Sequence, residues 1–173
     1  MTDQELRAIQ APLKDRYRAE PASALATLRV SGTLDLPQLA CRIETGRGAL
    51  TNAGLHPMAG GDGSFACSAD MLLEALVGCA GVTLCAVATA MNLPITAGAM
   101  TAEGDLDFRG TLGVSRDAPV GFTAIRLLVD LDTTADDAVL AKLGQLTERY
   151  CVVAQSLNEA ARPQVTCRRR NSA

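Results

Sequence analysis

The sequence of 173 residues contains no tryptophan, one histidine, two tyrosines and three phenylalanines. Hydrophobic residues nevertheless make up 48% of the chain, so we expect a core built mainly of alanine, leucine and valine. A chain of this length forms one domain and can bury such a core without disulfide bonds. An apolar fraction this high favours an oligomer or an exposed ligand groove.

Several catalytic motifs are also missing. His56 is the only histidine and no Cys-x-x-Cys pair occurs, so the sequence lacks the usual ligands of a zinc site. No G-x-G-x-x-G loop, Walker loop or G-x-S-x-G elbow is found, which argues against nucleotide binding and serine hydrolysis. We therefore expect neither a metal nor an organic cofactor, and we expect His56 to be a surface residue of a glycine-rich loop.

The formal charge of −3 at pH 7 argues against nucleic acid as the main partner. The one basic run, Arg168–Arg170, is expected to be solvated. No basic start followed by an apolar stretch marks a secretory signal. The longest apolar run, 75–91, is interrupted by glycines and follows Asp70 and Glu74, so it predicts a buried helix rather than a membrane span. We expect a cytoplasmic protein without membrane partners, whose six cysteines are thiols.

The N-terminal residues 1–21 have the pattern of a separate amphipathic helix, which Pro21 ends. Its apolar positions are Leu6, Ile9, Leu13 and Tyr17. We expect this helix to lie on the main domain, residues 22–173, or on a partner subunit.

Three short stretches compatible with β-structure follow, at 25–32, 38–46 and 48–52. After a glycine-rich loop, a long helix is predicted to begin at Ser68 or Asp70, with Ser68 as its expected N-cap. Asn92 and Pro94 end the helix. Since this segment has almost no polar face, we expect it to be buried nearly all round.

Alternating patterns predict two further strands, at 95–116 and 120–132. Thr134 is the expected cap of a helix over 135–149, and another helix runs from Cys151 to Ala161. A last, edge strand follows at 164–170. This order of elements predicts an α+β fold with antiparallel sheets and with the helices on one side.

Cys79 lies past the middle of the long apolar helix. Gly78 and Gly81 flank it and would allow the close approach of another backbone or of a ligand. A thiol in such surroundings can pack as a small apolar group or act as a nucleophile. Reactivity requires a cation or hydrogen-bond donor near the sulfur. We expect the helix to supply none locally, so an arginine would have to come from another element.

Cys151 stands at the junction of two predicted helices, where a helix N-terminus can lower the pKa of a thiol. Packing is the alternative role here too. Among the other cysteines, Cys85 falls on a different helix face from Cys79. Cys41 and Cys167 are expected in the core and Cys67 in a loop.

Two segments carry a resemblance to a known family. Residues 68–79 read Ser-x-Asp-Met-Leu-Leu-x-Ala-Leu-x-Gly-Cys, which resembles the helix signature of the OsmC/Ohr family. Tyr150–Val153 resembles the second cysteine segment of that family. The order of elements and the Gly-Gly loop before the long helix also fit, over roughly residues 24–170.

The resemblance implies an intertwined homodimer with a thiol-dependent peroxidase site at its interface. Cys79 would attack an organic hydroperoxide and become a sulfenic acid, which Cys151 would resolve as a disulfide. A dithiol or lipoylated reductant would then open this bond. Asp70 occupies the place of the family's helix-start glutamate. The activating arginine is one of Arg29, Arg42 and Arg47, with Arg42 favoured. The substrate pocket is expected to include Leu76, Val77, Val152 and Val153.

Two other functions fit the same fold. The protein could bind an apolar small molecule in the same pocket at the dimer interface without turnover, or serve as a structural subunit for a partner. A short distance between the two sulfurs, with an arginine directed at Cys79, would favour the enzyme.

Overall fold

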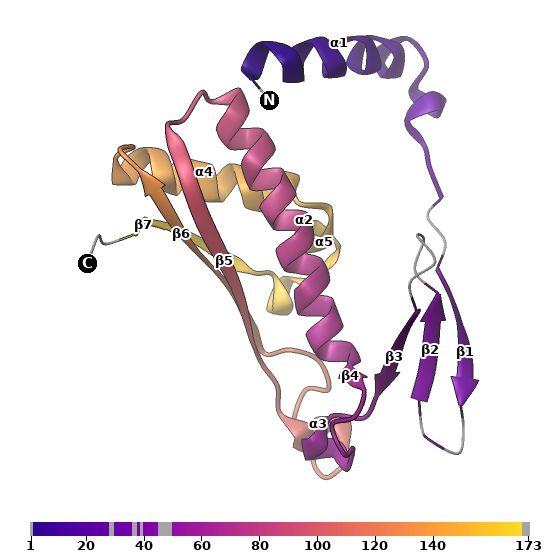
Figure 1. The fold of residues 1–173 in the computed structure, drawn as a ribbon. Coiled ribbons are helices and arrows are strands. Elements are labelled where there is room, and N and C mark those ends of the chain that lie inside the picture. The colour runs from indigo at the N-terminus through magenta and orange to yellow at the C-terminus, as the bar shows by residue number, and fades with distance from the viewer. Residues whose placement is uncertain (1, 28–29, 36–37, 39, 45–49, 171–173) are drawn as a thin grey trace.

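The computed structural model describes residues 2–27, 30–35, 38, 40–44 and 50–170. Over these residues the chain has an α+β fold with two sheets. Figure 1 shows the smaller N-terminal strands standing apart from a body of three strands and their helices.

The body is organised around a three-stranded sheet in the order β5-β6-β7. The central strand β6 (Ala124–Thr133) runs antiparallel to β5 (Ile95–Asp105) and parallel to β7 (Gln164–Arg169). Every second residue of β6 is buried, as expected for a sheet covered on one face. These inward residues are Ile125, Leu127, Val129 and Leu131.

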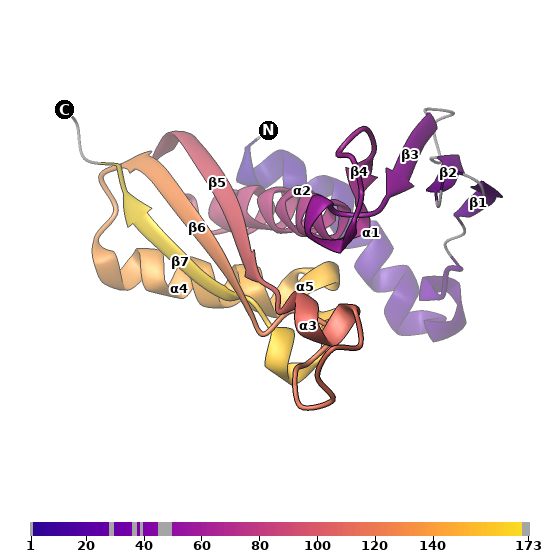
Figure 2. The same cartoon turned by 90° about the horizontal axis from the view of Figure 1, so that it is seen from below.

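Two helices cover the inward face of this sheet. Helix α2 (Ser68–Ala90) contacts β5, while α4 (Asp137–Tyr150) contacts β7 and packs against α2. The short helix α5 (Val152–Ser156) follows α4 directly and also contacts α2. Figure 2 shows the helices on one side of the sheet. The outer face is charged, and Arg126 binds Asp105 there at 2.7 Å.

The N-terminal sheet has the order β1-β2-β3-β4. It consists of β1 (Ser31–Asp35), β2 (Ala40–Glu44), β3 (Leu50–Gly54) and the two-residue β4 (Ala66–Cys67). The strand β4 leads directly into α2 and connects this sheet to the body. Val30 and Leu34 are largely exposed beside or on β1, so this sheet lacks a cover within the described chain.

Helix α1 (Asp3–Ala19) confirms the helix predicted at the N-terminus. Thr2 and Glu5 form a reciprocal capping box, in which the Glu5 amide donates to Thr2 at 3.2 Å and the Thr2 amide donates to Glu5 at 2.7 Å. The helix contacts α2 and then extends away from the body, as Figure 1 shows. None of its residues is buried.

The long helix α2 is confirmed, but two details of its prediction are wrong. Its N-cap is Cys67 rather than Ser68. It is not buried all round: Leu76, Ala80, Leu84 and Ala88 form one buried stripe. On the other side Val82 is 74% exposed, and a Cβ added at Gly78 or Gly81 would meet nothing within 4 Å.

By length and composition alone, α2 could also cross a membrane, with 22% of its apolar window buried. The core helix of a soluble protein meets the same test. The packing of its buried stripe against a sheet and another helix favours a core helix. The helix α2 therefore has two apolar faces. One is covered by this chain, and the other is left open.

Other expected boundaries differ from the structure. Both sheets are mixed rather than antiparallel, because β3 pairs with β4 and β6 with β7 in parallel. The first strand begins at Ser31 and not at 25. The expected strand 95–116 ends at Asp105, because Asp107 caps a short helix α3 (Phe108–Thr111). Asp136 instead of Thr134 caps α4, and the last predicted helix ends at Ser156, before a 3₁₀ turn over Glu159–Ala161.

Candidate thiol site

The fold brings Cys79 and Cys151 together. Cys79 lies in the middle of α2, and Cys151 links α4 to α5 as the N-cap of α5. Cys151 is completely buried, and Cys79 packs, partly buried, against the hydrophobic cluster that contains it. Each of the two thiol groups acts on the pKa of the other. Two cysteines separated by more than seventy residues of sequence therefore share one site.

Burial raises the pKa of the Cys79 thiol, but hydrogen bonds outweigh this effect and the pKa lies below its usual value. The donors are the backbone N–H of Val153, the thiol of Cys151 and the N–H of Val152, with a further bond from Thr83. Donors of this kind stabilise the charged form of an acid. Cys79 is therefore the thiol of the pair that ionises first.

Burial also raises the pKa of Cys151, and here the opposing bonds are too weak to reverse the shift. The Ala154 amide donates to its sulfur at 3.4 Å, while its bond to Cys79 and the negative charge on Cys79 raise the pKa further. The amides of Ala154 and Val153 at the start of α5 lower the pKa of Cys151, as expected of a helix N-terminus, but burial and Cys79 outweigh them, so the expected net lowering is wrong. The amides of Val152 and Val153 also act on Cys79.

The expectation that α2 itself supplies no donor to Cys79 is also wrong. Thr83 lies one turn further along α2, and its hydroxyl donates to the carbonyl oxygen of Cys79 at 2.8 Å. The same side chain helps to lower the pKa of the Cys79 thiol. The spacing Cys-x-x-x-Thr was visible in the sequence, since residues four apart on a helix are neighbours.

The predicted arginine is not among the groups that act on Cys79 within the described part of the chain. Arg29 and Arg47 lie outside the described residues. The backbone of Arg42 pairs with Thr33 and Asn52 in the N-terminal sheet. Its side chain is not among the parts that the structure describes. The role of Arg42 stays a prediction.

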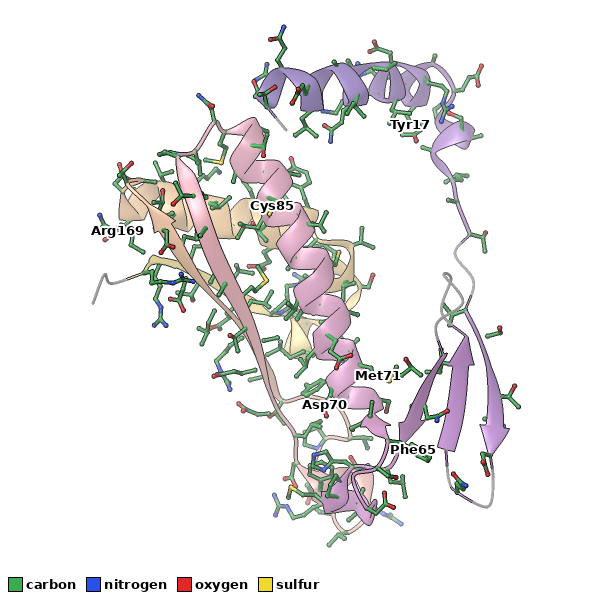
Figure 3. The ribbon with its side chains drawn as sticks, viewed as in Figure 1. Tyr17, Phe65, Asp70, Met71, Cys85 and Arg169 are labelled. Carbon is green, nitrogen blue, oxygen red and sulfur yellow. The ribbon has the colours of Figure 1, made fainter. Side chains whose placement is uncertain are left out.

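Asp70 lies in the first turn of α2 and is exposed. Cys79 lies nine positions further along α2, which places it on the opposite side of the helix and about 14 Å away along the helix axis. Figure 3 shows Asp70 near the N-terminal end of α2 and Cys85 towards the opposite end. At this distance Asp70 cannot contact the Cys79 sulfur itself. It can act on the site only through another residue, which agrees with its expected role of orienting an arginine.

The four predicted pocket residues are not equivalent. Leu76 is fully covered by its own chain and packs in the core, while Val77 and Val153 are partly buried in the same cluster. Val152 is 71% exposed. Apolar side chains thus surround the thiol pair, and Val152 has the largest free surface among them.

A separate pocket of about 390 Å³ lies at the N-terminal end of α2. The His56 ring stacks on Phe108 there, with ring centroids 4.8 Å apart, and accepts a hydrogen bond from the Met58 amide at 3.0 Å. Cys67 also lines this pocket and is partly buried. Neither Cys79 nor Cys151 lines it. His56, expected as a plain surface residue, therefore has a packing role.

The remaining cysteines do not join the thiol pair. Cys85 is exposed on a different face of α2, as predicted, while Cys41 and Cys167 are partly buried. Burial raises the pKa of Cys167 to about 11, so this thiol stays protonated at neutral pH. Within the described residues no group of three or more potential metal ligands occurs.

Known structures share this fold. An OsmC-like protein from Mycoplasma pneumoniae matches with a TM-score of 0.66 and 12% identity, over 84% of this chain and 96% of that one. An organic hydroperoxide resistance protein from Elizabethkingia anophelis matches with a TM-score of 0.69 and 11% identity, over 85% and 99%. The organic hydroperoxide resistance protein OhrB of Bacillus subtilis gives 0.62 and 18%, over 84% and 100%.

No curated protein sequence matches this chain. At identities below a fifth, the solved structures establish the fold alone. The family model of OsmC-like proteins, however, matches residues 61–166. This range contains α2, the strands β5 and β6, the start of β7 and both cysteines of the thiol pair. The chain therefore belongs to the OsmC-like protein family.

Proposed function

We propose that the protein is a thiol-dependent peroxidase that reduces organic hydroperoxides. The observation that carries this proposal is the asymmetry of the thiol pair. Hydrogen bonds lower the pKa of Cys79, burial raises that of Cys151, and each group acts on the pKa of the other. A thiolate beside a protonated thiol is what a peroxide-reducing site with a resolving cysteine requires.

The chemistry follows from this arrangement. The Cys79 thiolate attacks the terminal oxygen of R–O–O–H, the O–O bond breaks, and the alkoxide leaves as the alcohol after gaining a proton. Cys79 is then a sulfenic acid. The sulfur of Cys151 attacks it, an S–S bond forms and water is released. A dithiol or lipoylated reductant regenerates both thiols by exchange.

The substrate class rests on the surroundings of Cys79. The sulfur is partly buried among apolar side chains, with Val152 exposed beside it and Val77 and Val153 partly buried. An apolar approach favours an alkyl or aryl hydroperoxide over hydrogen peroxide. The names of several proteins with the same fold, which describe organic hydroperoxide resistance, support the same class. We also propose that the protein is cytoplasmic, because the dithiol and lipoylated reductants named above belong to the cytoplasm.

We also propose an intertwined homodimer. The open stripe of α2, with Gly78, Val82 and Cys85, requires a cover, and Leu34 on β1 is 73% exposed. A two-fold symmetric partner would cover both with one surface. The site would then gain residues from the second subunit, and Arg42 is the arginine we propose to act there, oriented by Asp70.

The proposed reaction is tested by trapping its intermediate. Reduced protein is mixed with cumene hydroperoxide and a sulfenic-acid reagent, and the modified residue is mapped by mass spectrometry. Label on Cys79, or a Cys79–Cys151 disulfide, is the expected result. The Cys79→Ser variant should show neither, whereas Cys85→Ser, which removes an exposed thiol from the same helix, should behave as the unaltered protein. Unlabelled Cys79 without a new disulfide would refute the peroxidase.

A second function is favoured by the pocket at the N-terminal end of α2, which excludes both reactive cysteines. A volume of about 390 Å³ suits a small apolar ligand bound without turnover. Leu72→Arg would fill this pocket with a charged side chain. If the function is binding alone, Leu72→Arg abolishes uptake of a fluorescent apolar probe, and cumene hydroperoxide leaves Cys79 unmodified in the unaltered protein.

A further inference from the structure

Helix α1 lies outside the part of the chain that the family model covers, because that match begins at residue 61. The helix is charged on one side and apolar on the other. Leu6, Ile9, Leu13 and Tyr17 recur at intervals of three and four residues on its apolar side. In proteins such a helix is stabilised mainly by the packing of its apolar side against another surface.

The apolar side of α1 starts on α2 and then passes beyond it. The two helices are in contact, and Figure 1 shows α1 beginning beside the C-terminal end of α2 and running away from it. In the described structure the partly buried residues of α1 are Asp3, Leu6 and Gln10, and every later residue of the helix is exposed. Leu13 and Tyr17 continue the side that Leu6 begins, and Figure 3 shows Tyr17 towards the end of α1 that lies away from α2.

The open stripe of α2 favours one orientation of a second copy. The stripe follows the exposed Glu74 and runs through Gly78 and Val82 to Cys85. A two-fold axis along the helices would place two Glu74 side chains together and both α1 helices at one end of the pair. A two-fold axis across the helices makes them antiparallel and places Glu74 of one subunit beside Cys85 of the other. The antiparallel arrangement avoids both conflicts.

The length of α1 suits such a pair of helices. Packed helices lie about 8–10 Å apart. With a rise of about 1.5 Å per residue, Leu13 lies about 4–5 Å and Tyr17 about 10 Å beyond Gln10 along the axis of α1. The second half of α1 therefore reaches across one neighbouring helix. In the antiparallel pair, the part of that helix beneath it is the N-terminal end of the partner's α2.

The distribution of charge agrees with this arrangement. By helical periodicity, Lys14 and Arg16 lie on the two edges of the apolar side of α1. The C-terminal part of α2 and the turn after it, residues 79–94, contain no charged residue. The N-terminal end of α2 has the exposed Asp70 and Glu74. Complementary charges beside an apolar contact fix which surfaces meet, and they favour the partner's N-terminal end of α2.

We propose that α1 is a clamp that holds a second copy of this chain. The first half of α1 rests on α2 of its own subunit, and its second half packs Leu13 and Tyr17 on the N-terminal half of α2 in the other. Lys14 and Arg16 then lie near the acidic residues of that helix end. The proposal rests on the proposed homodimer, and it gives the N-terminal helix the task of closing over the pair of α2 helices.

Photo-crosslinking tests this contact. Chains with p-benzoylphenylalanine in place of Tyr17 are allowed to exchange subunits with isotope-labelled chains of unaltered sequence, and the cross-linked peptides are mapped by mass spectrometry after irradiation. The expected product joins α1 to a labelled peptide within residues 68–78. The same photoreactive group in place of Asp15, on the opposite side of α1, should not give this product. A dimer whose cross-links stay within one chain or lead to another element would overturn the clamp.

Affinity provides a second measurement. Leu13→Ser combined with Tyr17→Ser should weaken the dimer roughly tenfold or more in sedimentation equilibrium, because a symmetric dimer loses each apolar contact twice. These variants should fold, since neither residue is buried. Leu112→Ser removes an exposed leucine elsewhere and should leave the dissociation constant unchanged. An unchanged dissociation constant in the double variant would overturn the proposal.

The charge contribution is tested by reversal. Lys14→Glu should weaken the dimer, and Glu74→Lys in the same chain should restore part of the affinity. If Glu74→Lys weakens the Lys14→Glu protein further, the two helix segments do not meet and the clamp is refuted.

Failure of the clamp is distinguishable from failure of the functions proposed above. An unaltered protein that sediments as a monomer would refute the homodimer and the clamp together. A dimer with cross-links elsewhere would refute the clamp alone. The peroxidase reaction enters neither measurement and is reported separately by the sulfenic-acid trap.

Discussion

Cys79 packs against the buried cluster that contains Cys151, and the pKa values of the two thiols move in opposite directions. The N–H group of Val153 and the thiol of Cys151 lower the pKa of Cys79 against the effect of its burial, whereas burial raises the pKa of Cys151 and the neighbouring Cys79 raises it further. Neither residue has a charged side chain of the described chain as a cause of its shift, apart from the charge of Cys79 acting on Cys151. The local packing therefore favours ionisation of Cys79 before Cys151, which is the order that the proposed reaction requires.

The Cys151→Ser variant should separate the two steps. Serine keeps a hydroxyl donor for Cys79 but cannot form a disulfide, so the sulfenic acid should form at a similar rate and then persist. Excess hydroperoxide should convert it to the sulfinic acid. Intact-mass spectrometry should show first one and then two added oxygen atoms, where the unaltered protein shows the loss of two hydrogens.

Cys151→Ala is the matched variant without a donor at this position. The pKa of Cys79 should rise, and the first step should slow at neutral pH but recover at alkaline pH. Equal first-step rates in the serine and alanine variants would contradict the assignment of Cys151 as a donor to Cys79.

Cys167 makes stability depend on pH at the alkaline end. Its pKa is about 11 in the folded protein, above a usual value of 9.0, so its contribution is complete below about pH 9 and is lost as the pH rises through 11. Two pKa units correspond to at most about 2–3 kcal/mol of unfolding free energy. Cys167→Val should remove this part of the alkaline decline in chemical denaturation measured from pH 8 to 11. Parallel curves for the two proteins would contradict it.

Cys79 should act in the opposite direction. Since its folded-state pKa is lowered, its thiolate adds stability above the unfolded-state pKa, and this contribution is lost as the pH falls through the folded-state value. Comparison of Cys79→Ser with the unaltered protein isolates this contribution in the same denaturation series.

The sequence was sufficient for some parts of this site and not for others. The apolar period of α2 and the second cysteine segment placed Cys79 and Cys151 on helices, and family resemblance paired them. A helical pattern shows that the apolar faces of α2 need to be covered, but it does not show which chain covers them. The exposed stripe of α2 with Val82 could therefore not be predicted from the sequence. The donors from Val152 and Val153 are backbone groups, which any residue type provides, and they carry no sequence signal.

Local capping chemistry explains the misplaced boundaries. Asp107 and Asp136 accept backbone N–H groups at the starts of α3 and α4, and each competes with a pattern that predicted strand or an earlier cap. Such competition between side chain and backbone is decided by a few atoms. The strand β6, whose inward face is set by burial over many residues, was by contrast predicted to within one residue at its end, although its predicted start lay four residues too early.

Gly110 should not tolerate a side chain. It is buried in α3, and an added Cβ would lie 2.6 Å from the carbonyl oxygen of Ala118 and closer still to that of Pro119. Gly110→Ala should therefore lower the free energy of unfolding by about 1–3 kcal/mol. Gly121→Ala is the matched control, because a Cβ there would meet nothing within 4 Å, and it should be neutral or slightly stabilising. Equal effects of the two substitutions in urea denaturation would contradict the inference that the carbonyl oxygens of Ala118 and Pro119 leave no room for a side chain at Gly110.

Val82 provides the sharpest test of the proposed homodimer. It is 74% exposed on α2, while Val114, in the segment before β6, is 73% exposed. If a second subunit covers the open stripe of α2, Val82→Asp places a charge in that interface and should convert the dimer to monomer, as measured by light scattering coupled to size exclusion. The loss should be at least tenfold in affinity, since burial of an unpaired charge costs several kcal/mol.

Val114→Asp makes the same chemical change at a site of equal exposure in the described chain and should leave the mass in solution unchanged. Circular dichroism should show both variants folded, because neither side chain belongs to the buried core. A Val82→Asp protein that remains a dimer would place the interface elsewhere on the molecule. In that case the open space beside Gly78 and Gly81 would not be explained by the approach of a second subunit.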